Sequence, residues 1–477
     1  MTGPFPFFAK LKFPSPSLPA VVQLLFFLLL NTLLYNYRFD IGLSFFLSDL
    51  LVLALLILTM LEWKGLRAAR GVRPWLVLFA ILLAYYLILA GYARLMLGSS
   101  LHHILGGFRY LFFYLLTFFA GLYFTANMAD MVRITRYIRV HLVLAIVPGV
   151  LSLWFPALNP ASIYLDGKLS PPLYFMVVGV ETALLGGLVF VGELIALAAR
   201  RHATWFSLLF LLAALVGILG CQNRGVLAAV LLMTGLVFGY GLKADPPLKK
   251  RLLTCLGLAM LVTAGLCLAL LFSPAYEKFK GRVEATIAFF KGEQPFFRTI
   301  PGVRVGRTVV IFKEWLKSPV IGCGWGQEIK EYPISDWQGK HVKGCSGTPH
   351  NYFITILYRN GAIGFVLMMA ILGLIFRRLK PNRPMDRENG LEYALFIFYI
   401  GVLLFSAANT QLYSHPVFIP VVFFLFGAGV SHASLHRTSE NQRLPETAPA
   451  AQPARPAAHR AEESLLEGRR GEDADPV

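Results

Sequence analysis

Apolar stretches recur along nearly all of this 477-residue chain, and they limit what it can fold into. A helix rises about 1.5 Å per residue, so roughly 20 apolar residues cross the hydrocarbon core of a bilayer. Hydrophobic residues make up 56% of the chain and charged residues only 15%, with a mean hydropathy of +0.62. This composition excludes an ordinary soluble globular protein. The sequence therefore predicts an all-α integral membrane protein.

The apolar stretches predict about twelve transmembrane helices. They lie at 18–37, 41–61, 74–93, 104–126, 137–156, 171–199, 204–221, 225–242, 252–272, 350–376, 391–409 and 415–432. Lys10 and Lys12 precede the first stretch, but it is longer than the apolar core of a signal peptide and no small-residue cleavage site ends it. We therefore expect it to remain as the first helix.

One long connection interrupts this pattern and divides the chain into four parts. Residues 1–272 hold the first nine predicted spans, 273–349 form a large loop, and 350–436 hold the last three spans. Residues 437–477 are rich in Ala, Pro, Glu and Arg and contain no aromatic residue, which is typical of a disordered tail. The sequence therefore predicts a transmembrane bundle with one large helical loop.

The distribution of Lys and Arg predicts which side of the membrane each connection faces, because short cytoplasmic loops carry an excess of these residues. Eighteen of them lie in alternate short connections, at 64–73, 133–139, 200–201, 243–251 and 377–387. The remaining short connections hold four, namely Arg38, Arg94, Lys168 and Arg224. Both termini are therefore predicted in the cytoplasm and the large loop on the opposite side. The net charge of +18 follows mostly from this bias, and no soluble face remains to bind nucleic acid.

The large loop is long for a connection and strongly basic. It contains twelve Lys or Arg residues against seven acidic ones. Ordinary connections are only a few residues long, so its length suggests a function. The positive charge has two interpretations: the loop binds an anionic ligand, or it crosses the membrane as long loops do, regardless of charge.

Two arginines of the loop share one face of a predicted helix. Arg304 and Arg307 are three residues apart in the segment 303–316. Two guanidinium groups on one face can hold phosphate oxygens in a forked arrangement. The alternative is an amphipathic surface helix without a ligand.

The same helix has an apolar face, and a glycine-rich turn follows it. Val309, Phe312 and Leu316 form that face, which is suited to packing on the bundle. Pro319 ends the helix. A tight, backbone-accessible turn follows, with glycines at Gly322, Gly324 and Gly326.

A histidine and an arginine lie where the chain meets the predicted membrane surface. His350, followed by Asn351, stands where the loop re-enters the membrane. An imidazole has a pKa of about 6.5 and is a suitable general base, although the alternative is a plain interfacial histidine. Arg224 lies between two spans at their outer end, where it either reaches lipid headgroups or points into an outer cavity and binds phosphate.

Two further pairs are predicted from the cost of buried charge and from the redox compartment. Arg109 and Glu181 lie inside predicted spans toward the outer side, where charged side chains are costly, and we expect them to pair. Cys323 and Cys345 lie on the side of the membrane where disulfides persist. A disulfide between them is a further hypothesis, and it would tie the glycine turn to the approach of His350.

These motifs together resemble the O-antigen ligase and polymerase superfamily of membrane glycosyltransferases. The resemblance covers roughly residues 210–375. It is carried by Arg307 with Trp315, the run Ser318–Gly326, His350 with Asn351, the run Tyr358–Gly364, and Arg224 in Asn-Arg-Gly. One departure is Arg359, where the family often has an acidic residue.

The resemblance implies a twelve-helix-type bundle in the bacterial inner membrane, with the large loop in the periplasm. It implies transfer of a glycan from an undecaprenyl-diphosphate carrier to an acceptor hydroxyl, which is that of lipid A-core in the ligases. His350 is then the expected general base, giving direct displacement with inversion. The diphosphate is expected to bind three arginines, Arg224, Arg304 and Arg307.

The acidic residues of the loop lack metal-ligand spacing, so we expect a metal-independent enzyme without a cofactor. Asn351, Arg109 and Glu181 are candidate supporting residues. An O-antigen ligase is the first hypothesis, but polymerisation of O-antigen or exopolysaccharide and transfer to protein hydroxyls use the same constellation. A polysaccharide transporter has a similar topology, but its charged groups should lie near the midplane of the membrane.

Overall fold

The computed structural model describes residues 18–33, 38–40, 44–68, 71–125, 128–151, 179–199, 205–221, 223–271, 280, 284, 288, 291, 300–325, 328–335, 341–346, 351–386, 389–409 and 417–443. Only the backbone is described at 38–40, 44–45, 68, 128, 266–267, 269–271, 300–307, 328–335, 341–346 and 435–443. The chain divides into two units, Met1–Ala433 and Ser434–Val477. All contacts described below lie within the first unit.

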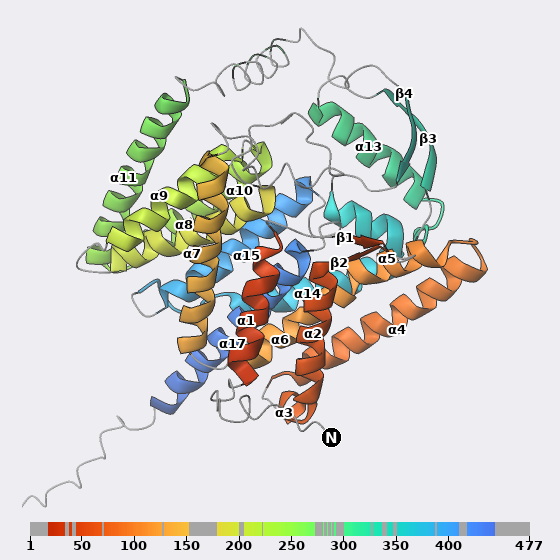
Figure 1. Ribbon diagram of the computed structural model, residues 1–477, viewed down its shortest axis with the longest axis horizontal. Helices are drawn as coiled ribbons and strands as arrows, with labels where there is room; N and C mark the ends of the chain where they lie inside the picture. Colours follow the sequence, from red (N-terminus) through yellow and green to blue (C-terminus); the bar gives the residue numbers. More distant parts are fainter. Residues whose placement is uncertain are drawn as a thin grey trace, which may run out of the picture. The chain divides into compact units, whose positions relative to one another are not determined.

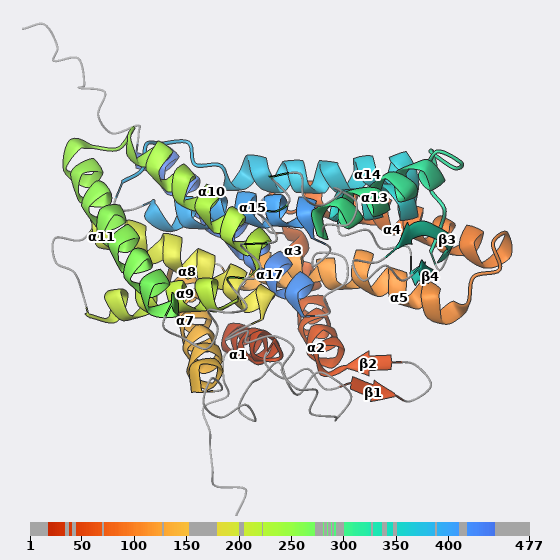
Figure 2. The ribbon, with the colours of Figure 1, turned by 90° about the horizontal axis from the view of Figure 1, so that it is seen from above.

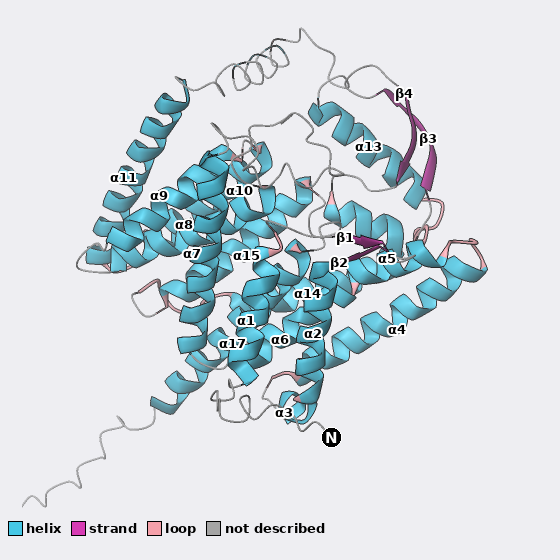
Figure 3. Cartoon of the chain, viewed as in Figure 1, coloured by secondary structure: helices cyan, strands magenta, loops and turns pink. Residues whose placement is uncertain are grey.

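Helices form most of the described chain, and two short hairpins complete it (Figure 1, Figure 3). The first helices are α1 (Leu18–Asn31), α2 (Leu47–Leu61), α3 (Trp63–Ala68), α4 (Arg73–Leu95), α5 (Leu101–Leu111), η2 (Phe113–Leu116), α6 (Thr117–Phe124), α7 (Met128–Leu151) and α8 (Val180–Ala199). They are followed by α9 (Trp205–Gly220), α10 (Arg224–Gly241), α11 (Pro246–Leu271), α13 (Ile300–Trp315), α14 (Tyr352–Leu379), α15 (Gly390–Ala408) and α17 (Phe418–Arg443). The antiparallel hairpins pair β1 (Arg38–Asp40) with β2 (Ser44–Phe46), and β3 (Glu328–Ser335) with β4 (His341–Ser346).

Seven helical segments of the described chain are long and apolar enough to cross a membrane. They are Arg73–Leu95, Leu101–Phe124, Ala129–Leu151, Val180–Ala199, Arg224–Gly241, Tyr352–Leu379 and Gly390–Ala408. Shorter apolar helices are Leu18–Asn31, Leu47–Leu61, Trp205–Gly220 and Phe418–Ser434. Every predicted span overlaps one of these segments or α11. The predicted class, a helical membrane protein, is confirmed, whereas the number of spans stays a prediction.

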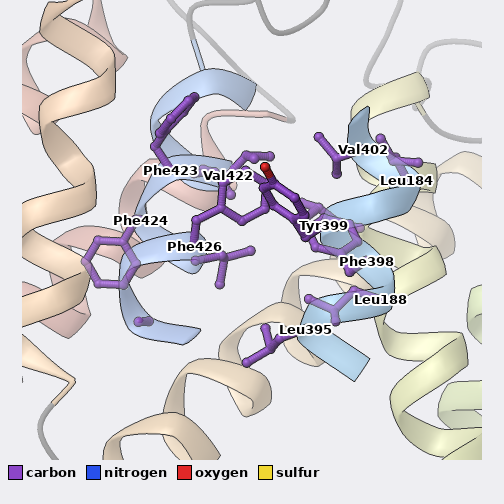
Figure 4. Close-up of a cluster of buried hydrophobic side chains, with 14 of the residues drawn as sticks. Leu184, Leu188, Leu395, Phe398, Tyr399, Val402, Val422, Phe423, Phe424 and Phe426 are labelled. Atoms are coloured by element: carbon purple, nitrogen blue, oxygen red, sulfur yellow. The ribbon is translucent and has the colours of Figure 1, made fainter. Parts of the chain in front are cut away.

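The core of the bundle lies around α8, α15 and α17. In the most apolar window of α8, 83% of the residues are buried, so this helix is surrounded by protein rather than lipid. It packs against α7, α9, α10, α11 and α15. Figure 4 shows side chains from α8, α15 and α17 gathered in one cluster, in which the rings of Tyr399 and Phe426 lie 4.8 Å apart.

The predicted large loop contains a hairpin as well as helix. The backbone of α13 follows the predicted helix 303–316 closely. The β3–β4 hairpin was not predicted, and its register shifts between Glu331 and Ser335, a stretch that contains Pro333. Because proline cannot donate a ladder hydrogen bond, it interrupts regular strand pairing and weakens the strand pattern in the sequence.

Arg109 is held by a buried carboxylate at the start of α2. Asp49 accepts hydrogen bonds from the Phe46 amide at 2.7 Å, from Arg109 Nη1 at 3.2 Å and from the Tyr114 hydroxyl. Arg109 Nη2 also donates to the Tyr110 hydroxyl at 3.1 Å, and its guanidinium carbon lies 4.8 Å from the centre of that ring. This cluster ties α2 to α5 and η2.

The acidic partner of Arg109 is therefore Asp49, and the predicted pair with Glu181 was wrong. Glu181 lies in the first turn of α8, and Asp49 in the first turn of α2. Both acids lie about ten residues after the start of a predicted span, 41–61 or 171–199. The sequence indicates that Arg109 needs a carboxylate at that depth, but it does not show which helix is adjacent.

The side chains of Asp49 and Arg109 are only 6% and 19% exposed, respectively. Replacement of Asp49 by Asn or of Arg109 by Gln therefore leaves the remaining charge without its partner in a largely buried place. We expect Asp49→Asn and Arg109→Gln each to lower the free energy of unfolding by about 1–3 kcal/mol. The double variant should lose less than the sum of the two. Thermal unfolding of the detergent-solubilised protein measures all three.

The pair Lys317–Glu314 is the control, because its side chains are 71% and 33% exposed. Its double-mutant cycle with Gln at each position should give a coupling free energy near zero. Additive losses at Asp49 and Arg109 would contradict the assignment of this ion pair.

Candidate functional site

Helix α14 is broken at Gly361, shortly after the point where the chain is predicted to re-enter the membrane. Gly361 has φ 63° and ψ −172°, a conformation open almost only to glycine. The break removes the intrahelical acceptors of the next two amides. The Ala362 amide instead donates to the Pro319 carbonyl at 2.9 Å, and the Ile363 amide donates to the Val320 carbonyl at 3.3 Å.

The glycine turn after α13 packs its backbone directly on this break. The Cys323 amide donates to the Tyr358 carbonyl at 2.7 Å. A Cβ at Gly322 would lie 2.4 Å from the Gly361 nitrogen, and a Cβ at Gly361 would lie 2.2 Å from the Val320 carbonyl oxygen. Side chains at these glycines are therefore excluded by the opposite backbone. We call residues 318–325 together with 358–363 the glycine junction.

Buried polar side chains fasten the glycine junction to α4. Asn360 Oδ1 accepts from Trp325 Nε1 at 2.7 Å, and Asn360 Nδ2 donates to the Tyr86 hydroxyl at 3.4 Å. The Tyr85 hydroxyl donates to the Asn360 carbonyl at 2.5 Å. Trp325 is buried and its ring meets that of Tyr86 edge-on at 5.3 Å. Helix α5 also packs closely on Trp325, because a Cβ at Gly107 would lie 2.9 Å from the Trp325 ring.

Arg359 also belongs to the glycine junction. It is buried, and its Nη1 donates to the Gly324 carbonyl at 3.3 Å. Its guanidinium carbon lies 5.3 Å from the centre of the Tyr358 ring. The Arg359 side chain thus contacts the backbone of the glycine turn. A carboxylate at this position could not make that donation, so this contact depends on the arginine.

Asn351 caps the first helical turn of α14. Its side-chain oxygen accepts from the Ile354 amide at 3.1 Å, and its carbonyl accepts from the Thr355 amide and hydroxyl at 3.0 and 2.7 Å. This cap fixes the direction in which the chain enters the helix. His350 itself lies outside the described residues, so its predicted role as general base stays a prediction.

α13 lies beside α14 and β3 (Figure 1, Figure 2). Ile311 is buried against Tyr358. Val309, Phe312 and Leu316, which were predicted to pack on the bundle, are exposed, so that prediction was wrong. Apolar periodicity identifies the face but does not show whether protein or lipid covers it. Of the two loop arginines, Arg304 and Arg307, the structure gives only the backbone, in the first half of α13.

Arg224 is exposed at the first position of α10. Asn223 caps this helix by accepting from the amides of Gly225 at 2.9 Å and Val226 at 3.3 Å. α10 packs on α15, and α15 also packs on α14. Arg224 and the glycine junction therefore stand on helices that share α15 as a neighbour.

Cys323 is a free thiol and does not form the predicted disulfide with Cys345. The glycine turn directs Cys323 to the end of α13, where its Sγ donates to the Glu314 carbonyl at 3.4 Å. The backbone of Cys345 lies in β4, opposite Ile329. Burial, with a smaller contribution from the Glu314 charge, raises the pKa of the Cys323 thiol to about 11. The thiol is therefore protonated near neutral pH.

The polar residues that fasten the glycine junction to α4 had no predicted role. Asn360 and Trp325 were part of the family resemblance, but Tyr85 and Tyr86 of α4 gave no signal, because tyrosines in an apolar stretch are common at membrane surfaces. Among the residues that the structure describes, no group of three or more His, Cys, Asp or Glu side chains could hold a metal ion.

Residues 208–369 match the family model described as O-antigen ligase. This range contains α10, α13, the glycine junction and the start of α14. The matched region is therefore similar to the O-antigen ligase family, and the predicted resemblance to the ligase and polymerase superfamily is confirmed. A comparison with curated proteins finds no match.

Alanine at either glycine of the junction should destabilise the protein. Gly322 (φ 77°) and Gly361 (φ 63°) both have positive φ, and a Cβ at either meets backbone atoms. We expect Gly322→Ala and Gly361→Ala each to cost at least about 1–3 kcal/mol. Thermal unfolding in detergent measures the loss.

Gly373 is the matched control, because it lies in the same helix, α14, and a Cβ there meets nothing within 4 Å. Gly373→Ala should leave stability unchanged or raise it by up to about 1 kcal/mol. Equal stability of the Gly361→Ala and Gly373→Ala variants would rule out the backbone contact.

The raised pKa of Cys323 predicts slow alkylation that accelerates with pH until about 11. Only the thiolate reacts, so at pH 8 the folded protein should react with iodoacetamide about 100-fold more slowly at Cys323 than the denatured chain does. Peptide mass spectrometry under non-reducing conditions measures the rate. A peptide linking Cys323 to Cys345, or rapid alkylation in the folded protein, would show that the thiol is not held as described.

Proposed function

We propose that this protein is a glycosyltransferase of the bacterial inner membrane that transfers a glycan from undecaprenyl diphosphate to an acceptor hydroxyl at the periplasmic face. The match of residues 208–369 to the O-antigen ligase family carries this proposal. The residues with suitable chemistry, Arg224, the two arginines of α13 and His350, all fall inside the matched range. The acceptor that we propose first is lipid A-core.

In the proposed reaction the acceptor hydroxyl attacks the anomeric carbon of the donor glycan. His350 takes the hydroxyl proton as the new carbon–oxygen bond forms. The bond between the anomeric carbon and the diphosphate breaks on the opposite side, and undecaprenyl diphosphate leaves with the bonding electron pair. A single displacement of this kind inverts the anomeric configuration.

The leaving group carries the charge that must be stabilised. Guanidinium groups bind phosphate oxygens in forked pairs and remain charged at all relevant pH values. Arg304 and Arg307 stand on α13, which packs on α14, and Arg224 opens α10. In the proposal these three residues bind the diphosphate, and no metal ion is needed to neutralise it.

The structural support for His350 comes from its neighbours in the chain. Asn351 caps α14 directly after it, and the glycine junction holds the other end of the same helical segment, residues 352–360. A general base must keep a fixed distance to the hydroxyl it deprotonates. The segment that follows His350 in the chain therefore has hydrogen-bonded contacts at both of its ends, which supports the proposed role.

Replacement of His350 by Ala should abolish transfer, because no base then accepts the hydroxyl proton. The test complements a strain that lacks the gene with the His350→Ala variant and analyses its surface polysaccharide and carrier-linked glycans. We expect loss of O-antigen-capped lipid A-core, with carrier-linked polymer accumulating. His102→Ala, at an exposed histidine in α5, should restore the wild-type profile.

Other outcomes separate the alternatives. Lipid A-core capped with single repeat units in the His350→Ala strain indicates a polymerase. Loss of glycosylated protein with normal lipopolysaccharide indicates a protein O-oligosaccharyltransferase. An unchanged profile, with the variant present in the membrane, removes His350 from the reaction.

A further inference from the structure

α13 holds the bundle with one side and leaves an apolar side open. Ile311 is fully buried against Tyr358 of α14. Val309, Phe312 and Leu316, which share another face because they are three and four residues apart, are 47%, 41% and 55% exposed. We call these three residues, of which Leu316 directly follows the last residue of α13, the open face of α13. A helix anchored on one side normally exposes polar residues on the other, so this face needs a partner.

Basic side chains border the open face. Lys313 and Lys317 are exposed and follow Phe312 and Leu316 by one residue, which places them along one edge of that face. Lys317 also bonds Glu314 at 2.7 Å. An apolar strip with lysines at its edge is typical of helices that lie in a membrane surface, where the lysines reach anionic headgroups.

The length of α14 places the end of α13 at a membrane surface. Residues 362–379 follow the break at Gly361 and rise about 27 Å, close to the thickness of a bilayer's hydrocarbon core of about 30 Å. Arg377 and Arg378 lie at the far end of this segment. If these arginines lie at the headgroups of one membrane surface, the length of the segment places Gly361 at the headgroups of the opposite surface.

The exposed surface of α14 continues into that of the loop. Ile363 and Val366 are exposed on the spanning part of α14, where lipid is the expected neighbour. The Ile363 amide donates to the Val320 carbonyl, and the side chain of Val320 is exposed as well. Val320 follows Leu316 by four residues, so exposed apolar side chains occur on α14, at Val320 in the glycine junction and at Leu316.

We propose that α13 is an interfacial membrane helix whose open face is covered by phospholipid. The lipid chains contact Val309, Phe312 and Leu316, and the anionic headgroups contact Lys313 and Lys317. This inference concerns a lipid-binding surface and does not depend on the proposed transfer reaction.

The test incorporates the photoreactive residue benzoylphenylalanine in place of Phe312, Leu316, Lys317 or Val366 in the full-length protein. Each variant is reconstituted in vesicles of phosphatidylethanolamine and phosphatidylglycerol and irradiated, and phospholipid adducts are quantified by mass spectrometry. Position 366 is the lipid-facing reference, and position 317 reports the basic edge. We expect positions 312 and 316, which contact lipid chains in the proposal, to match 366 within about twofold.

Two outcomes would overturn the proposal. Adduct yields at 312 and 316 far below the yield at 366 would show that water covers the open face. A cross-link between two copies of the chain at 312 would show that protein covers it. Position 309 replaces any labelled position whose variant does not elute as a single species, so that the face is tested in folded protein.

Discussion

At Gly322 and Gly361 two backbones meet without side chains between them, and the arrangement of α4, α13 and α14 follows from this contact. A helix that breaks near lipid leaves amides without partners, and each such amide is costly. The carbonyls of Pro319 and Val320 supply those partners. The loop is therefore a required part of the broken helix: without it α14 could not bend where it does, and without the bend the glycine turn would have no surface to pack on.

The sequence predicted the elements well and their contacts poorly, for a physical reason. Long apolar stretches indicate helices because only helices and closed barrels satisfy the backbone in lipid. Contacts between distant helices leave little local trace. Glu181 was the predicted partner of Arg109, and the packing of α2 against α6 instead brings Asp49 to it. The runs 318–326 and 358–364 were recognised as family motifs, but nothing in their spacing showed that they form one unit.

Two other differences between the predictions and the structure concern the neighbours of a side chain. The face of α13 that includes Phe312 was assigned to the bundle, because an apolar residue suits protein and lipid equally and periodicity does not distinguish them. Cys323 and Cys345 were linked by a compartment argument, which gives the chemical possibility of a disulfide but no distance. In the structure Cys323 contacts the Glu314 carbonyl of α13. Cys345 lies in the β3–β4 hairpin, which was not predicted from the sequence.

The anchoring of the glycine junction on Tyr85 and Tyr86 has a consequence for how this protein can be divided. The family match begins at residue 208, whereas both tyrosines belong to α4 (Arg73–Leu95), more than a hundred residues earlier. The matched region is thus not a transplantable module. A chimaera that exchanges residues 208–369 between relatives would have to bring a compatible α4 with it, because the hydrogen-bond partners of Asn360 in α4 are encoded outside the matched range.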